Sequence, residues 1–524
     1  MSNVSDNQVF GITLGNSSSS IAWIDEAGRP EVITNTDGEV ETPSYVYFET
    51  RDNIVVGSVA REMLCLEPER GVRLCLREVA NVDNVFTTPW GDSYSMVQIA
   101  AFIVKKLVND AEEATGNRVR KVVLSCPTWF GSAERRALKD SALYSGLDVV
   151  KVVDDTSAAV CAYTEQAHRC GQELPERVLI FDLGGSTLNV CVARTYSDSG
   201  SVEIVSSGGD AHLGGADWDA ALGELLVSKW CEATETSRDV VCDTMNRQEV
   251  FQIAERVKKM LTVRTNAKTR LSLNGETVIR AEVTRDEFEA ATASLLERAV
   301  QMTRQTLARA ARKEDIENFQ IDEIVCVGGG CLMPQISERL EREFEKPVRI
   351  FDPHICVGKG TVVLGNQPIA TFSPVLEKSY GILVSRNRED GSVEDVVFNL
   401  LLRQQRLSTA WYSKNFRVQS DGFRKIQIKM VESDSGGWQN GLNVEEQNRL
   451  IPFRMILNPV IHSLEIFLPA DVSRGEEITV TFHADQDGGV NVLALLQRTG
   501  ESLVLRGDDK VRPARRDISG IEIE

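Results

Sequence analysis

Two short turns in the sequence are built from residue types that bind phosphate. The first lies in FGITLGNSSSSIAWI and the second in LIFDLGGSTLNVCVA. Glycine lacks the Cβ atom that would block the close approach of a ligand, and successive backbone N–H groups in a tight turn bind anions. Serine and threonine hydroxyls add further donors. The candidate phosphate-binding residues are Gly15, Asn16, Ser17 and Ser18 in the first turn and Gly184, Gly185, Ser186 and Thr187 in the second.

The two turns are copies of one strand–turn–strand design. When the two units are laid over each other, Leu14 matches Leu183 and Gly15 matches Gly184. Such a repeat predicts two similar subdomains whose turns face each other and bind a ligand between them. Asp182, at the end of the strand before the second turn, adds a carboxylate of the kind that holds a hydrated Mg²⁺ ion.

The first 366 residues must form the elements that position these turns. Apolar strand-like runs alternate there with amphipathic helical stretches, which is typical of an α/β region with mostly buried strands. The expected elements include strands over 122–126, 149–153 and 178–181, a helix capped by Ser132 and ended by Gly146, and a helix over about 157–167.

The sequence changes character near residue 366. Pro368 and Pro374 punctuate a short polar segment, and beyond it runs such as IQIKMV, SLEIFL, EITVTF and VNVLAL are separated by turn residues. This pattern predicts an antiparallel β-sandwich. The expected organisation is an α/β domain over 1–366, a linker over 367–374 and a sandwich over 375–524 without a helical lid.

Composition argues against several classes of function. The net charge of −19 disfavours a nucleic-acid groove or an anionic membrane as the main partner. No apolar run approaches the roughly 18 residues of a membrane helix, and the polar start MSNVSDNQ is not a signal pattern, so we expect a cytoplasmic protein. The 11 cysteines include no CxxC pair, which disfavours structural zinc and a disulfide scaffold.

Eight segments, in their order along the chain, resemble the DnaK-type heat shock protein 70 family. They are GITLGNSSSSIAW, VVLSCPTWFGSAERRALKDSALYSGLDVVKVVDDTSAAVCAY, FDLGGSTLNV, GGDAHLGGADWD, AERVKKMLT, VTRDEFE, IVCVGGGCLMPQI and DPHICVGKGTVVLG. The resemblance covers nearly the whole chain. It implies an actin-like ATPase fold, made of duplicated ribonuclease-H-like units, followed by a peptide-binding β-sandwich. It also implies ATP or ADP and Mg²⁺ as cofactors.

The resemblance identifies further candidate contacts to the nucleotide. Glycine turns and one helical face in AERVKKMLT match the family's phosphate, ribose and adenine contacts. These positions are Gly214, Gly215, Glu255, Lys258, Lys259, Thr262, Gly328, Gly329 and Gly330. Without the family context, the Glu255 and Lys258 pair would be interpreted as a solvent-exposed helix ion pair worth roughly 0.3 kcal/mol.

Part of the family's hydrolytic machinery is present. Asp182 and Thr187 match the family pattern, with Asp182 as the metal-binding residue. Asp155 replaces a glutamate and is one methylene shorter. The resemblance therefore implies Asp182, Thr187 and Asp155 as the catalytic residues.

Other positions depart from the family pattern. Thr13 stands where the family has an aspartate, and Leu76 stands where it has a lysine. Arg77 is adjacent but is expected to point elsewhere if the segment is regular. Asn189 and Leu332 replace an aspartate and an arginine. Together these changes predict retained nucleotide binding with slow or absent hydrolysis.

Communication between the two domains is expected to differ from that of the family. Pro127 and Arg135 resemble the family's proline switch and arginine relay, whereas QPIATFSPVLEKSYG lacks the Asp-Leu-Leu pattern of its linker. The absence of a lid predicts fast exchange of any bound peptide. Phe398, Leu400 and Leu402 alternate with other residues as groove residues do, but a role in the core is favoured.

Two main functions follow from the resemblance. One is an ATP-driven molecular chaperone in protein folding, working with a J-domain co-chaperone, a nucleotide-exchange factor and unfolded or nascent polypeptide. The other is a non-hydrolysing, ATP-bound scaffold similar to atypical ribosome-associated family members. A sugar kinase or cytoskeletal actin relative would share the ATPase fold but would explain neither the sandwich nor AERVKKMLT.

Overall fold

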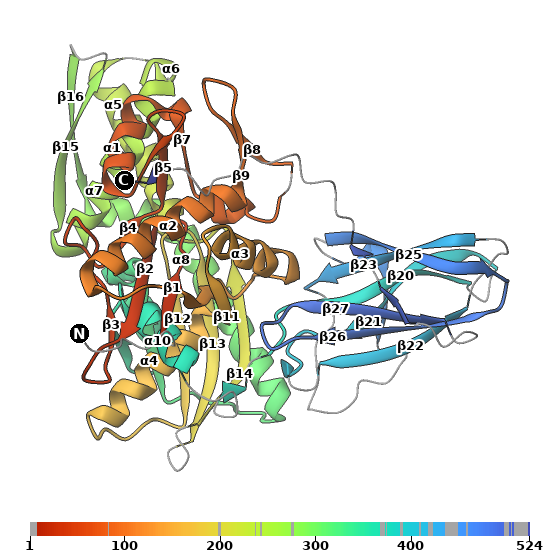
Figure 1. Cartoon of the computed structure of the whole chain (residues 1–524). Helices are drawn as coiled ribbons and strands as arrows, with labels where there is room; N and C mark the ends of the chain where they lie inside the picture. Colours follow the sequence, from red (N-terminus) through yellow and green to blue (C-terminus); the bar gives the residue numbers. More distant parts are fainter. Residues whose placement is uncertain are drawn as a thin grey trace.

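The computed structural model consists of an α/β domain and an elongated all-β sandwich beside it (Figure 1). The described residues are 8–81, 83–196, 201–235, 237–241, 244–273, 277–366, 372–373, 375–387, 391–407, 410–417, 423–434, 449–456, 460–496, 502–504, 506–507 and 522–523. Within these ranges, no helix combines the length and the apolar character that crossing a membrane requires.

The first half of the α/β domain is built on a sheet with the strand order β11-β10-β1-β2-β3. β1 forms an antiparallel hairpin with β2 and pairs in parallel with β10. Its core includes the fully buried Phe10, Phe102 and Leu124. The elements are β1 (Val9–Thr13), β2 (Ser18–Ile24), β3 (Pro30–Val32), α2 (Met96–Thr115), β10 (Lys121–Cys126), α3 (Ser132–Tyr144), β11 (Asp148–Asp154) and α4 (Asp155–Arg169).

The second half repeats this design, with the strand order β18-β17-β12-β13-β14-β19. β12 forms an antiparallel hairpin with β13 and pairs in parallel with β17, as β1 does with β2 and β10. The elements are β12 (Arg177–Leu183), β13 (Leu188–Tyr196), β14 (Ser201–Asp210), α5 (Gly215–Thr234), α6 (Arg238–Val241), α7 (Thr244–Val263), α8 (Arg285–Glu314), β17 (Glu323–Val327), α9 (Pro334–Phe344), β18 (Val348–Ile350), α10 (Cys356–Asn366) and β19 (Phe372–Ser373). The expected duplicated α/β fold is confirmed.

Smaller elements complete the α/β domain, and α4 and α10 pack together where its halves meet. Gly360 allows this approach, because a Cβ there would overlap the backbone of Ala158. The smaller elements are β4 (Thr42–Pro43), β5 (Tyr45–Phe48), β6 (Asn53–Val56), α1 (Ser58–Leu66), β7 (Gly71–Arg73), β8 (Val85–Thr87), β9 (Ser93–Ser95), β15 (Asn266–Leu273) and β16 (Thr277–Thr284).

The sandwich consists of two antiparallel sheets, ordered β24-β21-β20-β23-β25-β29 and β22-β26-β27-β28. Phe398 and Leu400 belong to its apolar core, and Leu402 is also buried. The strands are β20 (Ser379–Asn387), β21 (Val393–Leu401), β22 (Trp411–Arg417), β23 (Phe423–Ser433), β24 (Leu450–Pro452), β25 (Val460–Val472), β26 (Glu477–Ala484), β27 (Val490–Leu496), β28 (Ser502–Val504) and β29 (Arg506–Gly507). The expected all-β region is confirmed.

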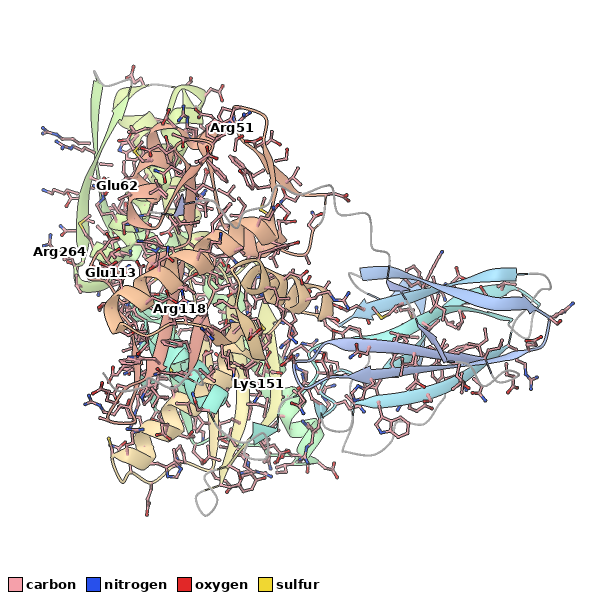
Figure 2. All side chains as sticks on the ribbon, in the orientation of Figure 1. Arg51, Glu62, Glu113, Arg118, Lys151 and Arg264 are labelled. Atoms are coloured by element: carbon pink, nitrogen blue, oxygen red, sulfur yellow. The ribbon has the colours of Figure 1, made fainter. Side chains whose placement is uncertain are left out.

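The sandwich contacts the first half of the α/β domain through α3 and β11. Arg135 is buried, pairs with Asp154 and donates from Nη1 to the carbonyl of Asp487, at 2.9 Å. The carboxylate of Asp487 accepts from the Val152 amide at 2.9 Å and pairs with Lys139. Figure 2 shows Lys151 of β11 on the side of the α/β domain that faces the sandwich. Lys151 lines a small cavity between the two domains. The predicted relay arginine therefore lies in the domain interface.

Ser132 also belongs to this interface, which corrects its expected role as a helix cap. The cap position of α3 is Gly131, whose amide donates to Glu134 at 3.0 Å. The Ser132 hydroxyl instead accepts from the Val490 amide at 3.1 Å, and the Ser132 amide donates to the Tyr380 hydroxyl at 3.1 Å.

The sandwich contacts the second half through β14. Glu377 accepts a hydrogen bond from Ser207, whose amide donates to Gln404 at 3.1 Å. β19 falls within the predicted linker and pairs in parallel with β14, while residues 367–371 and 374 of that linker lie outside the described residues. β30 (Glu522–Ile523) falls within the predicted sandwich range but pairs with β6 of the first half.

Candidate functional site

The two predicted phosphate-binding turns contact each other. A Cβ at Gly185 of the second turn would overlap the side chain of Ser17 in the first. The first turn is braced by Ser44, whose hydroxyl donates to the Gly15 carbonyl at 2.6 Å. The second turn is closed by a hydrogen bond from the Gly184 amide to the Thr187 carbonyl at 3.0 Å. The duplicated hairpins thus bring both turns to one place.

A short 3-10 helix, Cys75–Glu78, contacts both turns. The Asn16 side-chain oxygen accepts from the amides of Leu76 and Arg77, at 2.9 and 3.1 Å. The Arg77 guanidinium donates to the Ser186 carbonyl at 2.7 Å and lies 3.4 Å from Asp217. Leu76 is buried in the core of the first half.

The expectation that Arg77 points elsewhere is therefore wrong. It assumed a regular segment, whereas Leu74 adopts a left-handed backbone with φ 57° immediately before the 3-10 helix. This turn directs Leu76 into the core and Arg77 toward the second turn. Arg77 is a candidate site residue that sequence reasoning missed, although its charge and its position beside Leu76 were visible signals.

The start of α5 supports the second turn from behind. The amides of Gly215 and Ala216 donate to the carbonyls of Gly184 and Gly185, at 3.0 and 2.7 Å. A Cβ at Gly214 would overlap the backbone of Ser186, so the close contact requires glycine. Gly214 and Gly215 therefore lie against the predicted phosphate turn.

Buried acidic and polar side chains lie at the strand ends beside the turns. Burial raises the pKa of Asp182 to about 6. Burial also raises the pKa of Asp155, and the nearby charge of Asp182 raises it further. Asn189 donates to Asp182 at 3.2 Å. The Thr13 hydroxyl accepts from Ser125 at 3.2 Å, so the ends of β1 and β10 contribute neutral groups here.

The predicted contacts on α7 separate into two groups. Lys258 donates to the Gly215 carbonyl at 2.8 Å and pairs with Asp219 at 2.9 Å, which directs it to the second turn. Glu255 and Lys259 pair with each other at 2.7 Å. The Thr262 hydroxyl donates to the carbonyl of Lys259 in its own helix, at 2.6 Å. This bond stays within α7.

The glycine turn that follows β17 packs against the end of β12. Gly328 has φ +81°, and a Cβ there would lie 2.7 Å from Asp182 Oδ1. Gly330 lies against Leu183, whereas a Cβ at Gly329 would lie 3.1 Å from Cε1 of His354. The three glycines therefore allow the backbone after β17 to pack closely against the end of β12 and against His354.

His354 and Glu41 form a second contact that sequence reasoning missed. His354 Nδ1 hydrogen-bonds Glu41 Oε2 at 2.8 Å, and Glu41 Oε1 accepts from the Ser18 hydroxyl at 2.6 Å. His354 lies within the family-like segment DPHICVGKG, and Glu41 is 313 residues away along the sequence. The sequence contains no local signal that would pair them.

Two orphaned polar atoms test whether a nucleotide and its metal fit this site. Arg77 Nε and Asp155 Oδ1 are buried and have no hydrogen-bond partner. In the described part of the chain, no group of three or more His, Cys, Asp or Glu side chains is arranged to hold a metal. Mg²⁺ commonly uses only one or two carboxylates together with water and substrate phosphates. Asp155, Asp182 and Arg77 therefore fit a Mg²⁺–nucleotide.

Comparisons with known proteins agree with this arrangement. The model of the family described as Hsp70 protein matches residues 9–81 and 75–373. Chaperone protein DnaK of Thermotoga petrophila is 29% identical over 514 residues, which cover 96% of this chain and 81% of that protein. Chaperone protein DnaK of Halobacterium salinarum is 28% identical over 513 residues, covering 96% and 76%. Members of the family bind ATP or ADP, generally with Mg²⁺. The chain therefore belongs to the Hsp70 family and is an Hsp70-like molecular chaperone.

Proposed function

We propose that this chaperone binds ATP with Mg²⁺ at the two turns and hydrolyses it slowly. The observation that carries the proposal is the contrast at the strand ends, where Thr13 presents a hydroxyl and Asp182 presents a carboxylate. We further propose a cytoplasmic protein that works with a J-domain co-chaperone, a nucleotide-exchange factor and unfolded or nascent polypeptide.

Binding in this proposal depends mainly on backbone and neutral donors. The turns of residues 15–18 and 184–187 bind the phosphates through those amides and hydroxyls that are not already used within the protein, as nests of N–H groups do. Arg77 adds positive charge from the segment between the turns. Asp182 and Asp155 would hold the hydrated metal, and the Mg²⁺ ion, when bound, neutralises phosphate charge. Lys258 supports the second turn through Gly215.

Hydrolysis is slow in this proposal because charged groups are missing on one side. The Thr13 hydroxyl carries no charge and accepts a hydrogen bond from Ser125. The Leu76 side chain is buried and supplies no donor. Orienting a water molecule and neutralising developing charge are the main tasks in phosphoryl transfer. Of the three proposed catalytic residues, Asp155 is one methylene shorter than the glutamate of the family, which leaves Asp182 and Thr187 as the main contributors.

A non-hydrolysing scaffold is the second candidate, and the burial of Leu76 favours it. Single-turnover ATP hydrolysis, measured with and without peptide and a J-domain protein, separates the two. Slow turnover that the J-domain protein stimulates supports the chaperone cycle, and tight ATP binding without turnover supports the scaffold. Turnover at the rate of ordinary family members, lost in Asp182→Ala, would contradict slow hydrolysis.

A further inference from the structure

Ser18, Glu41 and His354 form a chain of contacts that joins three parts of the proposed nucleotide site. Ser18 belongs to the first turn and donates to Glu41 at 2.6 Å. Glu41 lies between β3 and β4 and hydrogen-bonds His354 at 2.8 Å. His354 lies between β18 and α10, against Gly329 of the glycine turn. The chain therefore links the first phosphate turn to the glycine turn.

The charged groups around His354 come from several elements. Glu41 faces it from the first half. Lys259 of α7 acts on it electrostatically and is itself paired with Glu255. On its own segment, Asp352 pairs with Lys359 at 3.0 Å. Because the other charges pair with one another, the charge of Glu41 is balanced directly by His354 when that ring is protonated.

Glu41 opposes phosphate binding in two ways. Its carboxylate accepts the proton of the Ser18 hydroxyl, which then cannot be donated to a phosphate oxygen. Its negative charge also repels phosphates bound at the first turn. Protonated His354 reduces the second effect, because it attracts the carboxylate and cancels its charge.

We propose that Glu41 and His354 form a proton-controlled regulator of nucleotide affinity, in which protonated His354 neutralises Glu41 and so permits tight binding of the phosphates. This rests on the proposed nucleotide site. The hydrogen bond that His354 donates to the Glu41 carboxylate raises the pKa of His354 above its ordinary value of 6.5. The favourable charge is therefore present below that raised value and is lost as the pH increases through it, so affinity falls toward alkaline pH.

The test measures the dissociation constants of Mg²⁺–ADP and Mg²⁺–ATP from pH 6 to 8.5 by calorimetry. The variants are Glu41→Gln, His354→Gln and His354→Lys, and His168→Gln, at the end of α4, is the matched control. The nucleotide's own titration is common to all proteins and cancels in the ratio of variant to wild type. Thermal unfolding checks that each variant is folded.

We expect the wild-type affinity to fall about three- to tenfold across this range relative to Glu41→Gln, which binds tightly and changes only with the titration of the nucleotide itself. His354→Gln binds weakly at every pH, and His354→Lys binds tightly at every pH. His168→Gln follows the wild type. If His354→Gln and Glu41→Gln keep the wild-type pH profile while nucleotide still binds, the inference is overturned. If wild type binds no nucleotide at any pH, the proposed function itself fails.

Discussion

The two halves of the α/β domain repeat one backbone design but differ in chemistry at equivalent positions. In the first half, Thr13 ends β1, opposite Ser20 on β2 and beside Ser125 on β10. In the second half, Asp182 lies opposite Asn189 on β13. The same place in the hairpin thus carries hydroxyls in one half and a carboxylate with its amide partner in the other.

This difference teaches that duplicating a backbone does not require duplicating its chemistry. The hydroxyls of the first half satisfy one another, because Ser125 donates to Thr13. The second half keeps a buried carboxylate whose pKa is raised to about 6 by burial, which is the environment that a bound cation stabilises. Both halves shape the site, while the strand-end charge comes from Asp182.

The strongest test of this asymmetry removes each group in turn. Asp182→Asn is expected to weaken Mg²⁺–ATP binding about 10- to 100-fold, because it removes a charge at the metal while keeping the shape. Thr13→Val should change affinity by less than about twofold. Calorimetry with and without Mg²⁺ measures both. Equal losses in the two variants would show that the halves contribute equally.

A second test restores the missing charge in the first half. Thr13→Asp is expected to increase the single-turnover rate of ATP hydrolysis about tenfold, since a positioned carboxylate can act on the water or the metal. Thr13→Asn is the matched neutral control and should leave the rate unchanged. A rate increase of similar size in both variants would mean that charge is not what the first half lacks.

The third test concerns Arg77, whose amide and guanidinium contact the first and the second turn, respectively. Arg77→Gln should weaken ATP binding about tenfold and AMP binding much less, because Arg77 contacts the second phosphate turn. Arg70→Gln, a change at a partly exposed arginine paired with Glu67, is the control. Fluorescence competition with ATP and AMP checks the prediction. Equal losses for the two nucleotides would place Arg77 away from the terminal phosphates.

The smallest expected effect is on domain docking. Each half of the α/β domain contacts one buried carboxyl group from the sandwich region. Burial, together with the nearby charge of Asp154, raises the pKa of Glu377 to about 7. Burial, assisted by Glu134, raises the pKa of Glu432 to about 7. Both exceed the ordinary value of 4.5, so the docked form prefers the protonated groups. Docking therefore strengthens as the pH falls from about 7 toward 4.5 and is weakest above about 7, where these groups are ionised in both forms.

Between pH 6 and 8.5, Glu377→Gln and Glu432→Gln should each reduce the change in the ratio of docked to undocked protein by about threefold. Small-angle scattering or a distance probe between the two domains reports the docked fraction. Glu377 faces Ser207 of the second half, and Glu432 lies against Gly131 of the first. An unchanged profile in both variants would exclude these carboxyls as the proton-binding groups.

The repeat and the alternation of elements predicted most of the fold. The strand expected over 122–126 is β10, and the one over 178–181 is part of β12. These elements follow from local apolar runs, which the sequence displays directly. Ser132 shows the limit of local rules, because its hydroxyl serves the Val490 amide from another domain instead of capping its own helix.

The candidate site was less predictable where long-range contacts decide side-chain direction. The glycine and hydroxyl turns could be recognised, because their residue types carry the chemistry. The direction of Arg77 depended on the left-handed backbone of Leu74, and leucine gives no sign of that conformation. The Glu41 and His354 pair required the folded chain to bring distant segments together.

The attachment of the sandwich at both ends has a mechanical consequence. β19 joins the sheet of the second half through β14, and β30 joins the small sheet of the first half through β6 (Figure 1). If the docking contacts open, the sandwich remains tethered to both halves and its local concentration at its docking surface stays high. One proteolytic cut would not free it.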